Sequence, residues 1–546
     1  MNTPLVSLAP ASSGHLEAIS ALQREQLFAA ANYHALRTPG ATLELRVGIG
    51  SITQMPALTD AGTVDGSALE GEPAFTVEVR SLAVGSMQAS PPERPVIRWI
   101  RLGHADATPA TTEPPAPASL PRRVYRELER RAPIVLDAAR ETIMRRRERA
   151  ISGPLPRYPE GAAAAHGRAA LDSWRHTPAA APSDAPPAVL FGLHWLQTGG
   201  AERWAVETIQ LAKNAGLLPV VVTDQNSVHP WLTRPELEGC IIIAQSFRGH
   251  LHELDIALTH AILENFNLAG VMLHHCQWLY LSLPWIAEHR PELPVIDSLH
   301  IVEYLGGGYP GLAAQYDAFI DTHHAISPEL VRWLTEVQGI AARKVALAPL
   351  TALTVDSSTD FTGRDPRNPF TISFVGRLSR QKRPDVFLML VHRLQRSGIP
   401  FRAIMHGDGE MRDVVHGLID QFGLRGIIEQ RYEETPVSET LAETNLLVVT
   451  SINEGITLTT FEAVAAGVPV LSADVGSQRT IVQGDMLAPR PARPFIKAAA
   501  SVISKLAADE QLREQRWNEQ RERVAEFGEL QSAHEWMKET FSQWHA

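Results

Sequence analysis

Two glutamates with seven residues between them, Glu454 and Glu462, have the type and spacing to bind a hydroxyl-rich ligand. Carboxylates accept hydrogen bonds from vicinal hydroxyls, so Glu462, in the first turns of a predicted helix, suits a ribose. Glu454 suits a sugar ring in the same way. A simpler interpretation is that both carboxylates stabilise the helix dipole. That interpretation accounts for Glu462 only in part, and it does not account for the Glu-Gly pair that starts the segment.

The turn that follows Glu454 is predicted to bind an anion. The apolar run NLLVVTS ends just before it, Gly455 lets the backbone turn tightly, and a helix is predicted to begin near Leu458. The first N–H groups of a helix have no partner inside it, so those of Ile456, Thr457 and Leu458 are expected to face outwards. Such N–H groups favour a phosphate.

A pair of cations is predicted near the same cleft. In FVGRLSRQKRP, a strand ends near Gly376, Arg377 stands at its carboxyl end, and Lys382 comes just ahead of a helix in which Pro384 suits the first turn. Two cations beside a helix start suit a pyrophosphate. On this motif alone, an ordinary basic loop after a strand is an equally good interpretation.

A glycine pair stands in LHWLQTGGAERWAVETIQLA, between a predicted strand and a predicted helix. Gly199 and Gly200 would let a ligand approach the backbone closely. The pair does not match the GxGxxG fingerprint, so no NAD site is predicted. The neighbours His274 and His275 suggest a metal pair, but adjacent residues of a strand point to opposite faces, and no metal site is expected.

These motifs follow the strands of two predicted parallel α/β domains. Short apolar runs alternate with helical segments over residues 188–352 and again over residues 366–508, which is typical of doubly wound parallel sheets. A polar stretch containing SSTDFTGRDPRNP separates them. Ligands of such folds bind at the carboxyl ends of the strands, so a cleft between the domains is expected to hold the motifs. The last stretch, 509–546, is predicted to be a charged helical tail.

The first third of the chain is predicted to be an accessory region. Residues 1–105 contain three runs with alternating apolar residues, which predict a small antiparallel sheet. Residues 106–187 contain two Pro/Ala-rich linkers around a basic segment that is predicted to be helical and to break at Pro133. A solvated helical face is the simplest interpretation of that segment. Contact with an anionic membrane surface or an acidic acceptor is the alternative.

Composition limits the function classes. The chain has 546 residues, a net charge of -11 and a pI near 6.0, which argue against a nucleic-acid partner. Two cysteines, Cys240 and Cys276, are too few for a disulfide framework and are expected to be buried thiols in a reducing compartment. The N-terminus lacks a signal-peptide pattern, and no apolar run is long enough to span a membrane. A cytoplasmic location is expected, with peripheral contact at the inner face of the cell membrane as an option.

The motifs GGAER, FVGRLSRQKRP, MHGDGEMRD and EGITLTTFEAVAAGVPVLSADVGS together resemble those of glycosyltransferase family 4, also called glycosyl transferases group 1. The resemblance covers residues from about 188 to 520. It implies the GT-B fold, in which two Rossmann-like domains face each other across a cleft, and a nucleotide diphosphate sugar as donor. The catalytic residues that it implies are Arg377, Lys382, Glu454 and His300. The donor-binding residues that it implies are Gly199, Gly200, Gly376, Gly407, Asp408, Gly455, Ile456, Thr457, Leu458 and Glu462.

The implied reaction transfers a hexose-type sugar with retention of its anomeric configuration. It needs no metal or other cofactor, because Arg377 and Lys382 would stabilise the charge that grows on the departing diphosphate. The implied acceptor is a cell-envelope or polysaccharide glycan, a lipid-linked sugar or a protein. Thr480 stands where a glutamate is common in the family, so the nucleotide base stays open. A non-catalytic nucleotide-sugar binding or assembly protein and a nucleotide-sugar epimerase of the same fold are the alternative functions.

Overall fold

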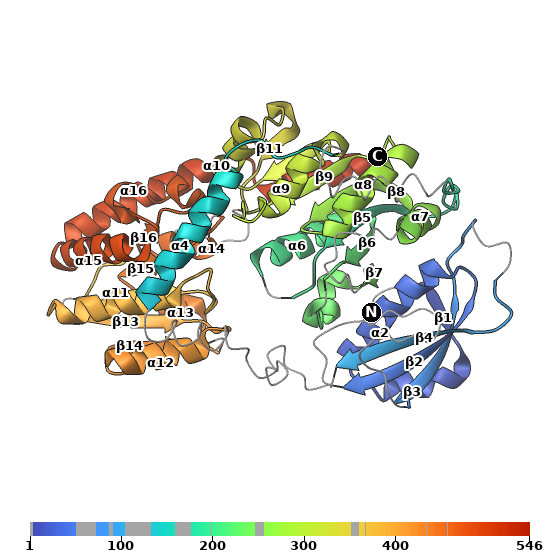
Figure 1. The fold of residues 1–546 in the computed structure, drawn as a ribbon, viewed down its shortest axis with the longest axis horizontal. Helices are drawn as coiled ribbons and strands as arrows, with labels where there is room; N and C mark the ends of the chain where they lie inside the picture. The colour runs from blue at the N-terminus through green and yellow to red at the C-terminus, as the bar shows by residue number, and fades with distance from the viewer. Residues whose placement is uncertain are drawn as a thin grey trace.

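The computed structural model describes residues 4–50, 72–86, 91–103, 133–158, 176–197, 199–225, 227–245, 256–350, 360–365, 367–432, 434–455 and 457–545. Within these ranges the chain forms three sheets of four, seven and six strands. Figure 1 shows the first sheet in blue, the N-terminal α/β domain in green and the C-terminal α/β domain in orange and red.

The first sheet has the strand order β1-β3-β2-β4. Its elements are β1 (Val6–Leu8), α1 (Ser13–Glu17), α2 (Ala21–Arg37), β2 (Thr42–Gly50), β3 (Phe75–Ser81) and β4 (Val96–Gly103). The prediction of a purely antiparallel sheet is wrong, because β4 pairs in parallel with β2. Alternating apolar residues indicate which face of a strand is buried, and they carry no information on the direction of its neighbour. Helix α2 covers the apolar face and also packs against β7 (Ile241–Ala244) of the next sheet, where Asn32 Nδ2 donates to the Ile242 carbonyl at 2.9 Å.

The N-terminal α/β domain holds a parallel sheet in the order β11-β10-β9-β8-β5-β6-β7. Its strands are β5 (Pro187–Leu193), β6 (Leu218–Thr223), β7 (Ile241–Ala244), β8 (Asn267–His274), β9 (Val295–Leu299), β10 (Thr322–Ala325) and β11 (Val345–Leu347). Its helices are α6 (Gly200–Asn214), α7 (Ile256–Asn265), α8 (Gln277–His289), α9 (Gly308–Gln315) and α10 (Pro328–Arg332). Both faces of the sheet are buried, which explains the nearly continuous apolar runs of its strands.

The C-terminal α/β domain holds a second parallel sheet in the order β14-β13-β12-β15-β16-β17. Its strands are β12 (Phe370–Val375), β13 (Phe401–His406), β14 (Ile428–Arg431), β15 (Leu446–Val449), β16 (Val470–Ala473) and β17 (Leu487–Ala488). Its helices are α11 (Pro384–Arg396), α12 (Arg412–Phe422), α13 (Val437–Ala442), α14 (Leu458–Ala465), α15 (Ala492–Ala508) and α16 (Glu510–Gly528). The predicted pair of doubly wound domains, the architecture called GT-B, is therefore confirmed.

The last stretch of the chain is shared between the two α/β domains. Trp517 and Phe527 of α16 belong to the C-terminal core. Met537 and Phe541 of α17 (Ala533–His545) belong instead to the core of the N-terminal α/β domain. The sequence predicts a charged amphipathic helical tail for residues 509–546, and the apolar stripe of such a helix is enough to dock it on a neighbouring domain.

A buried charge network supports the sheet of the N-terminal α/β domain. His323 Nδ1 lies 3.0 Å from Asp297 Oδ1, and His323 Nε2 lies 3.1 Å from Asp317 Oδ1. Burial alone would lower the pKa of His323, but the two carboxylates raise it to about 9. The imidazole is therefore charged at neutral pH, and its charge stabilises the folded state.

Candidate functional site

The C-terminal side of the site is formed where the loops after β12 and β13 meet. Gly376 and Gly407 follow these strands with φ of 149° and 141°. A Cβ on Gly407 would lie 2.1 Å from the Gly376 carbonyl oxygen, so only glycine fits there. A Cβ on Gly409 would lie 3.1 Å from Arg377 Cγ, which places Arg377 against the second loop. Asp408 lies on that loop and accepts hydrogen bonds from its own neighbours, from the Gly409 N–H at 2.8 Å among them.

Lys382 and Glu454 form an ion pair at the carboxyl end of the sheet. Lys382 Nζ lies 2.6 Å from Glu454 Oε1, and the Ser451 hydroxyl donates to the same oxygen at 2.5 Å. The Glu454 side chain is 7% exposed and the Lys382 side chain 26% exposed. The structure thus brings together two residues that the sequence analysis chose from separate motifs.

Helix α14 begins beside this ion pair. Thr457 is its N-cap residue, and the Thr457 hydroxyl bonds with the Thr460 hydroxyl at 2.5 Å and accepts from Gln478 Nε2 at 2.7 Å. The Thr457 side chain caps none of the N–H groups of the first turn. The N–H of Leu458 is therefore one of those that need a partner from outside the helix. Ile456, the remaining residue of the predicted anion site, lies outside the described residues.

The glycine pair of the N-terminal α/β domain lies opposite α14. A Cβ on Gly200 would lie 3.9 Å from Leu458 Cδ1, so the start of α6 faces the start of α14. A Cβ on Gly199 would lie 2.0 Å from Glu202 Oε2, so Gly199 leaves room for this carboxylate. The starts of α6 and α14, one from each domain, therefore face each other, with the Glu202 carboxylate beside the start of α6.

Glu462 and Arg203 connect the two domains electrostatically. Burial raises the pKa of Glu462, and Arg203, in the first turn of α6, opposes that rise. Arg203 lies in the GGAER motif but is not among the residues predicted from the sequence. The helical spacing could have indicated it, because Arg203 comes three residues after Gly200 and therefore lies on the same face of α6.

His300 contributes its backbone to the contact between the domains. A Cβ on Gly455 would lie 2.4 Å from the His300 carbonyl oxygen. The His300 ring packs edge-on against His275, with the ring centroids 5.2 Å apart. Burial, with a smaller contribution from His324, lowers the pKa of His300 well below its usual value. The imidazole is therefore neutral at pH 7, and it can orient a hydroxyl but supplies no positive charge.

A row of hydrogen bonds joins the two α/β domains next to His300. These bonds are Tyr304 Oη to the Ile452 carbonyl (3.0 Å), Asn453 Nδ2 to the Val302 carbonyl (3.0 Å), Ser477 Oγ to Ser327 Oγ (2.5 Å) and Thr480 Oγ1 to Glu329 Oε2 (2.6 Å). Thr480, where the resemblance leads one to expect a glutamate, thus binds the opposite domain. The domains are in direct contact on this side of the cleft.

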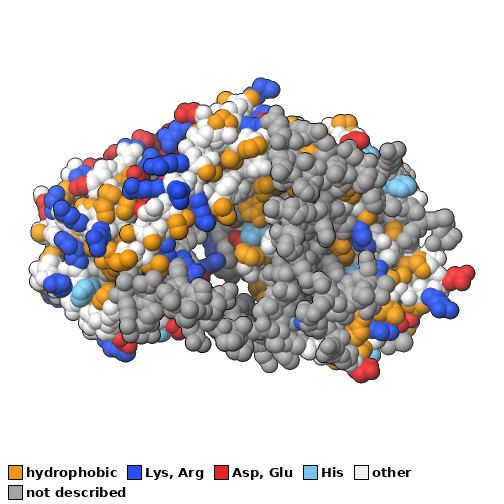
Figure 2. Space-filling view, in the orientation of Figure 1, with side chains coloured by type: hydrophobic (Ala, Val, Ile, Leu, Met, Phe, Trp, Pro, Cys, Tyr) orange, Lys and Arg blue, Asp and Glu red, His pale blue; other side chains and the backbone are white. Residues whose placement is uncertain are grey.

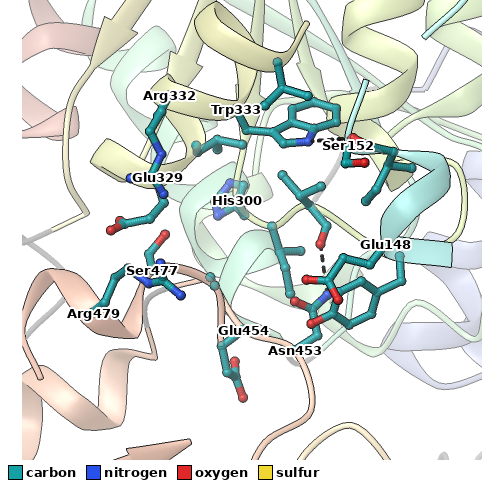
Figure 3. Close-up of a pocket in the computed structure, with 18 of the residues that line it drawn as sticks. Glu148, Ser152, His300, Glu329, Arg332, Trp333, Asn453, Glu454, Ser477 and Arg479 are labelled. Atoms are coloured by element: carbon teal, nitrogen blue, oxygen red, sulfur yellow. Dashed lines mark hydrogen bonds between the residues drawn. The ribbon is translucent and has the colours of Figure 1, made fainter. Parts of the chain in front are cut away.

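A cavity of about 330 Å³ lies beside this row and is shown in Figure 3. The labelled residues that surround it are Glu148, Ser152, His300, Glu329, Arg332, Trp333, Asn453, Glu454, Ser477 and Arg479. Arg377, Lys382 and the glycine pair are not among the residues that line it. The cavity thus reaches Glu454, Gly455 and His300 of the predicted site, whereas the two cations lie outside its lining.

Residues 133–158, which we call the strap, connect the two α/β domains beside this cavity (Figure 1). The strap begins with α4 (Pro133–Ala150), whose Asp137 lies 3.2 Å from Arg383 and whose Glu141 lies 2.8 Å from Arg490. Beyond α4, the Ile151 carbonyl accepts from Trp333 Nε1 at 3.3 Å in the N-terminal α/β domain. The predicted solvated helix therefore has a buried face that the sequence analysis missed.

Arg383 holds the strap and the loop that carries Lys382. It is buried, and its backbone has a φ of 51°. Its guanidinium donates to the carbonyls of Thr450 at 2.6 Å, Ser451 at 3.1 Å and Arg490 at 2.8 Å. A non-glycine residue persists in this conformation only where its surroundings fix it, so Arg383 is a structural support of the site.

Other candidate chemistries receive no support from the described part of the chain. No group of three metal-type ligands occurs there, and no helix there is long and apolar enough to cross a bilayer. Cys240 and Cys276 are buried thiols, and burial raises the pKa of Cys240 to about 12. His274 bonds to Thr208 Oγ1 at 2.8 Å, whereas His275 stacks on Tyr309, so the two rings have different neighbours.

Comparison with curated proteins finds D-inositol 3-phosphate glycosyltransferases. The relative from Rhodococcus erythropolis is 28% identical over 233 residues, which are 38% of this chain and 52% of the relative. The relative from Gordonia bronchialis is 24% identical over 242 residues, which are 39% of this chain and 53% of the relative. The chain thus spans about half the length of the curated relatives it matches.

Two solved structures are similar over most of their own length. HepE from Anabaena, in complex with UDP and glucose, gives a TM-score of 0.49 at 17% identity over 65% of this chain and 97% of that one. The lipopolysaccharide outer core galactosyltransferase WaaB gives 0.45 at 16% identity over 66% and 95%. A family model, described as glycosyl transferases group 1, matches residues 358–523. The C-terminal α/β domain, with Arg377, Lys382, Glu454 and Glu462, therefore carries the sequence pattern of the group 1 glycosyl transferases.

Proposed function

We propose that this chain is a metal-independent, retaining glycosyltransferase. It would transfer a hexose-type sugar from a nucleotide diphosphate sugar to a cell-envelope or polysaccharide acceptor. The observation that carries the proposal is the Lys382–Glu454 ion pair at 2.6 Å, beside the start of α14 and opposite the glycine pair of the other domain. A diphosphate in this gap would meet Lys382, Arg377 and the free N–H groups of a helix start.

The proposed chemistry depends on the leaving group. As the glycosidic bond breaks, negative charge grows on the β-phosphate, and Arg377 and Lys382 would stabilise it without a metal ion. A β-phosphate oxygen would take the proton of the attacking acceptor hydroxyl, which approaches from the face that the diphosphate leaves. Glu454 would hold donor-sugar hydroxyls, Glu462 would hold the ribose, and the neutral His300 would orient a hydroxyl of the sugar or acceptor.

The test begins with the donor. Purified protein is heated with UDP, GDP, ADP or dTDP, since a bound nucleotide raises the melting temperature by mass action. The nucleotide that stabilises selects the nucleotide sugar for turnover assays with and without EDTA. We expect turnover to survive EDTA and to be lost in Lys382→Ala and Arg377→Ala. Arg393→Ala, on the exposed face of α11, is the matched control. Nucleotide binding without turnover on any acceptor extract would instead support a non-catalytic binding protein.

A further inference from the structure

A row of polar side chains follows the strands of the N-terminal α/β sheet at their carboxyl ends. Gln245 follows β7, Asp224 follows β6, His194 follows β5 and His275 follows β8. These four strands are neighbours in this order. The side chains therefore stand next to one another at the edge of the sheet that borders the cleft.

Each of these four residues has a buried polar atom with no hydrogen-bond partner in the described part of the chain. The atoms are His194 Nδ1, Asp224 Oδ1, Gln245 Nε2 and His275 Nε2. Asp224 has no exposed surface, Gln245 is 4% exposed and His275 is 8% exposed. Buried polar atoms in folded proteins are nearly always paired, so four such atoms along one sheet edge indicate a missing ligand.

The backbone and rings of this row are held in place. His275 has a φ of 61°, a conformation that is costly for a residue with a side chain. Tyr309 stacks on the His275 ring, with the ring centroids 4.6 Å apart and the ring planes 3° from parallel. The His194 ring lies 5.6 Å from the His275 ring. Strain that the surroundings maintain in this way is typical of binding sites.

Two carboxylates, those of Asp224 in the row and of Glu202 beside it, carry negative charge. Glu202 Oε1 lies 2.9 Å from His194 Nε2. Burial alone would raise the pKa of Glu202, but the hydrogen bond from His194 and the charge of His194, with a smaller contribution from Trp195, lower it to about 2, so it is ionised. Burial raises the pKa of Asp224 to about 6, which leaves it mostly ionised at pH 7. Among the described residues, no Lys or Arg acts on either carboxylate.

The opposite wall of the cleft has the reverse character. Arg377 and Lys382 lie there, on the C-terminal α/β domain. Figure 2 shows a hollow between the two halves of the molecule, with Lys and Arg side chains toward the C-terminal side and a His side chain toward the other. A phosphate group is therefore favoured on one wall and repelled by the carboxylates on the other.

We propose that the row of His194, Asp224, Gln245 and His275 binds the acceptor, and that the acceptor presents uncharged hydroxyls there, as a saccharide or cyclitol without phosphate does. The inference rests on the proposed glycosyltransferase function and adds the chemical class of the acceptor. Carboxylate oxygens and imidazole nitrogens pair with hydroxyls in donor and acceptor roles. A phosphorylated acceptor would place two further negative charges beside Glu202 and Asp224, where His194 is the one described group that offsets the two carboxylates. This expectation differs from the acceptor in the names of the curated relatives, which is D-inositol 3-phosphate.

The first experiment compares acceptors that differ by one phosphate. Transfer from the radiolabelled nucleotide sugar is measured to myo-inositol and D-inositol 3-phosphate, and to the neutral and anion-exchange-bound fractions of a cellular glycan extract. We expect label in the neutral fraction, and a kcat/KM for the uncharged cyclitol no lower than for its phosphate. Label that enters only the anionic fraction and is released by phosphatase would overturn the proposal. If neither fraction takes label while the nucleoside diphosphate still stabilises the protein, the proposed function itself is wrong.

The second experiment tests the row directly. Asp224→Asn keeps an oxygen for the Trp278 N–H, which Asp224 Oδ2 accepts at 2.9 Å, and removes the charge. We expect the acceptor KM to rise about tenfold or more, with unchanged thermal stabilisation by the nucleoside diphosphate. Asp317→Asn, in the same domain but away from the row, is the control for a lost, partly buried carboxylate. An Asp224→Asn variant with the acceptor KM of the control would contradict the assignment.

Discussion

Replacing Glu454 by glutamine should tighten the binding of a nucleoside diphosphate while it abolishes most sugar transfer. Lys382 is held by Glu454 at 2.6 Å, so an incoming diphosphate has to take the ammonium group away from this carboxylate. Glutamine has the same shape and can still accept from the Ser451 hydroxyl, but it carries no charge. The variant would leave Lys382 available to the phosphate oxygens.

The size of the effect follows from the burial of the pair. Exposed ion pairs contribute about 0–1 kcal/mol, and breaking a fully buried pair costs about 3–5 kcal/mol. Because the Glu454 side chain is 7% exposed and the Lys382 side chain 26% exposed, we take an intermediate free energy of about 1–2 kcal/mol for the ion pair. Removing the competition should therefore lower the Kd of the diphosphate about 5- to 30-fold. Lys382→Met should act in the opposite direction, because a charge-assisted hydrogen bond of about 1.5–3 kcal/mol is lost.

Isothermal titration of both variants with the stabilising nucleoside diphosphate, at low and high salt, gives the two Kd values. Turnover of the nucleotide sugar is measured in parallel. A Glu454→Gln variant that binds the diphosphate no better than the wild type, while Lys382→Met binds it normally, would show that the pair is structural. In that case the ligand would bind elsewhere in the cleft.

Three further perturbations test the supports of the site. Arg383→Ala should lower the free energy of unfolding by about 3–5 kcal/mol, because a buried carboxylate loses its cation, and urea unfolding measures this loss. The folded-state pKa of His323, about 9, lies above its usual 6.5. Its stabilisation, on the order of 3 kcal/mol, is therefore complete below pH 6.5 and lost as the pH rises through 9. The difference in melting temperature between wild type and His323→Gln should therefore shrink toward pH 10, and a constant difference would contradict a charged imidazole. Gly455→Ala should push the domains apart at the His300 carbonyl, which should lower the free energy of unfolding by about 1–3 kcal/mol and also lower turnover. Gly426→Ala, where a Cβ meets open space, should change neither quantity.

The sequence predicted the fold and the site best where a motif directly follows an apolar run that is typical of a buried strand. Both parallel sheets were predictable because fully buried strands give short apolar runs separated by helices. Lys382 and Glu454 were predictable as neighbours because both follow strands, and the carboxyl ends of parallel strands meet at one edge. No periodicity argument could show that they form an ion pair, since that depends on the distance between two loops.

Other parts of the site were beyond the sequence. Asp224 and Gln245 each look like the polar residue that normally ends a strand, and only the strand order places them in one row. Helix α4 was predicted as basic and solvated, because its buried face consists of Leu136 and of the acidic residues Asp137 and Glu141. Their partners, Arg383 and Arg490, are far away in the sequence. Long-range charge pairing of this kind leaves no local pattern for a sequence-based prediction to use.

The position of α17 has a consequence for the biosynthesis of the protein. This helix, Ala533–His545, is made after the whole C-terminal α/β domain, yet Met537 and Phe541 fill the core of the domain whose first strand is β5. While the chain emerges from the ribosome, the apolar side chains that α17 covers stay exposed until this helix has been made. Long-range contacts of this kind slow folding and favour off-pathway association. Chains that terminate early should therefore aggregate or be degraded instead of accumulating as a partly active fragment.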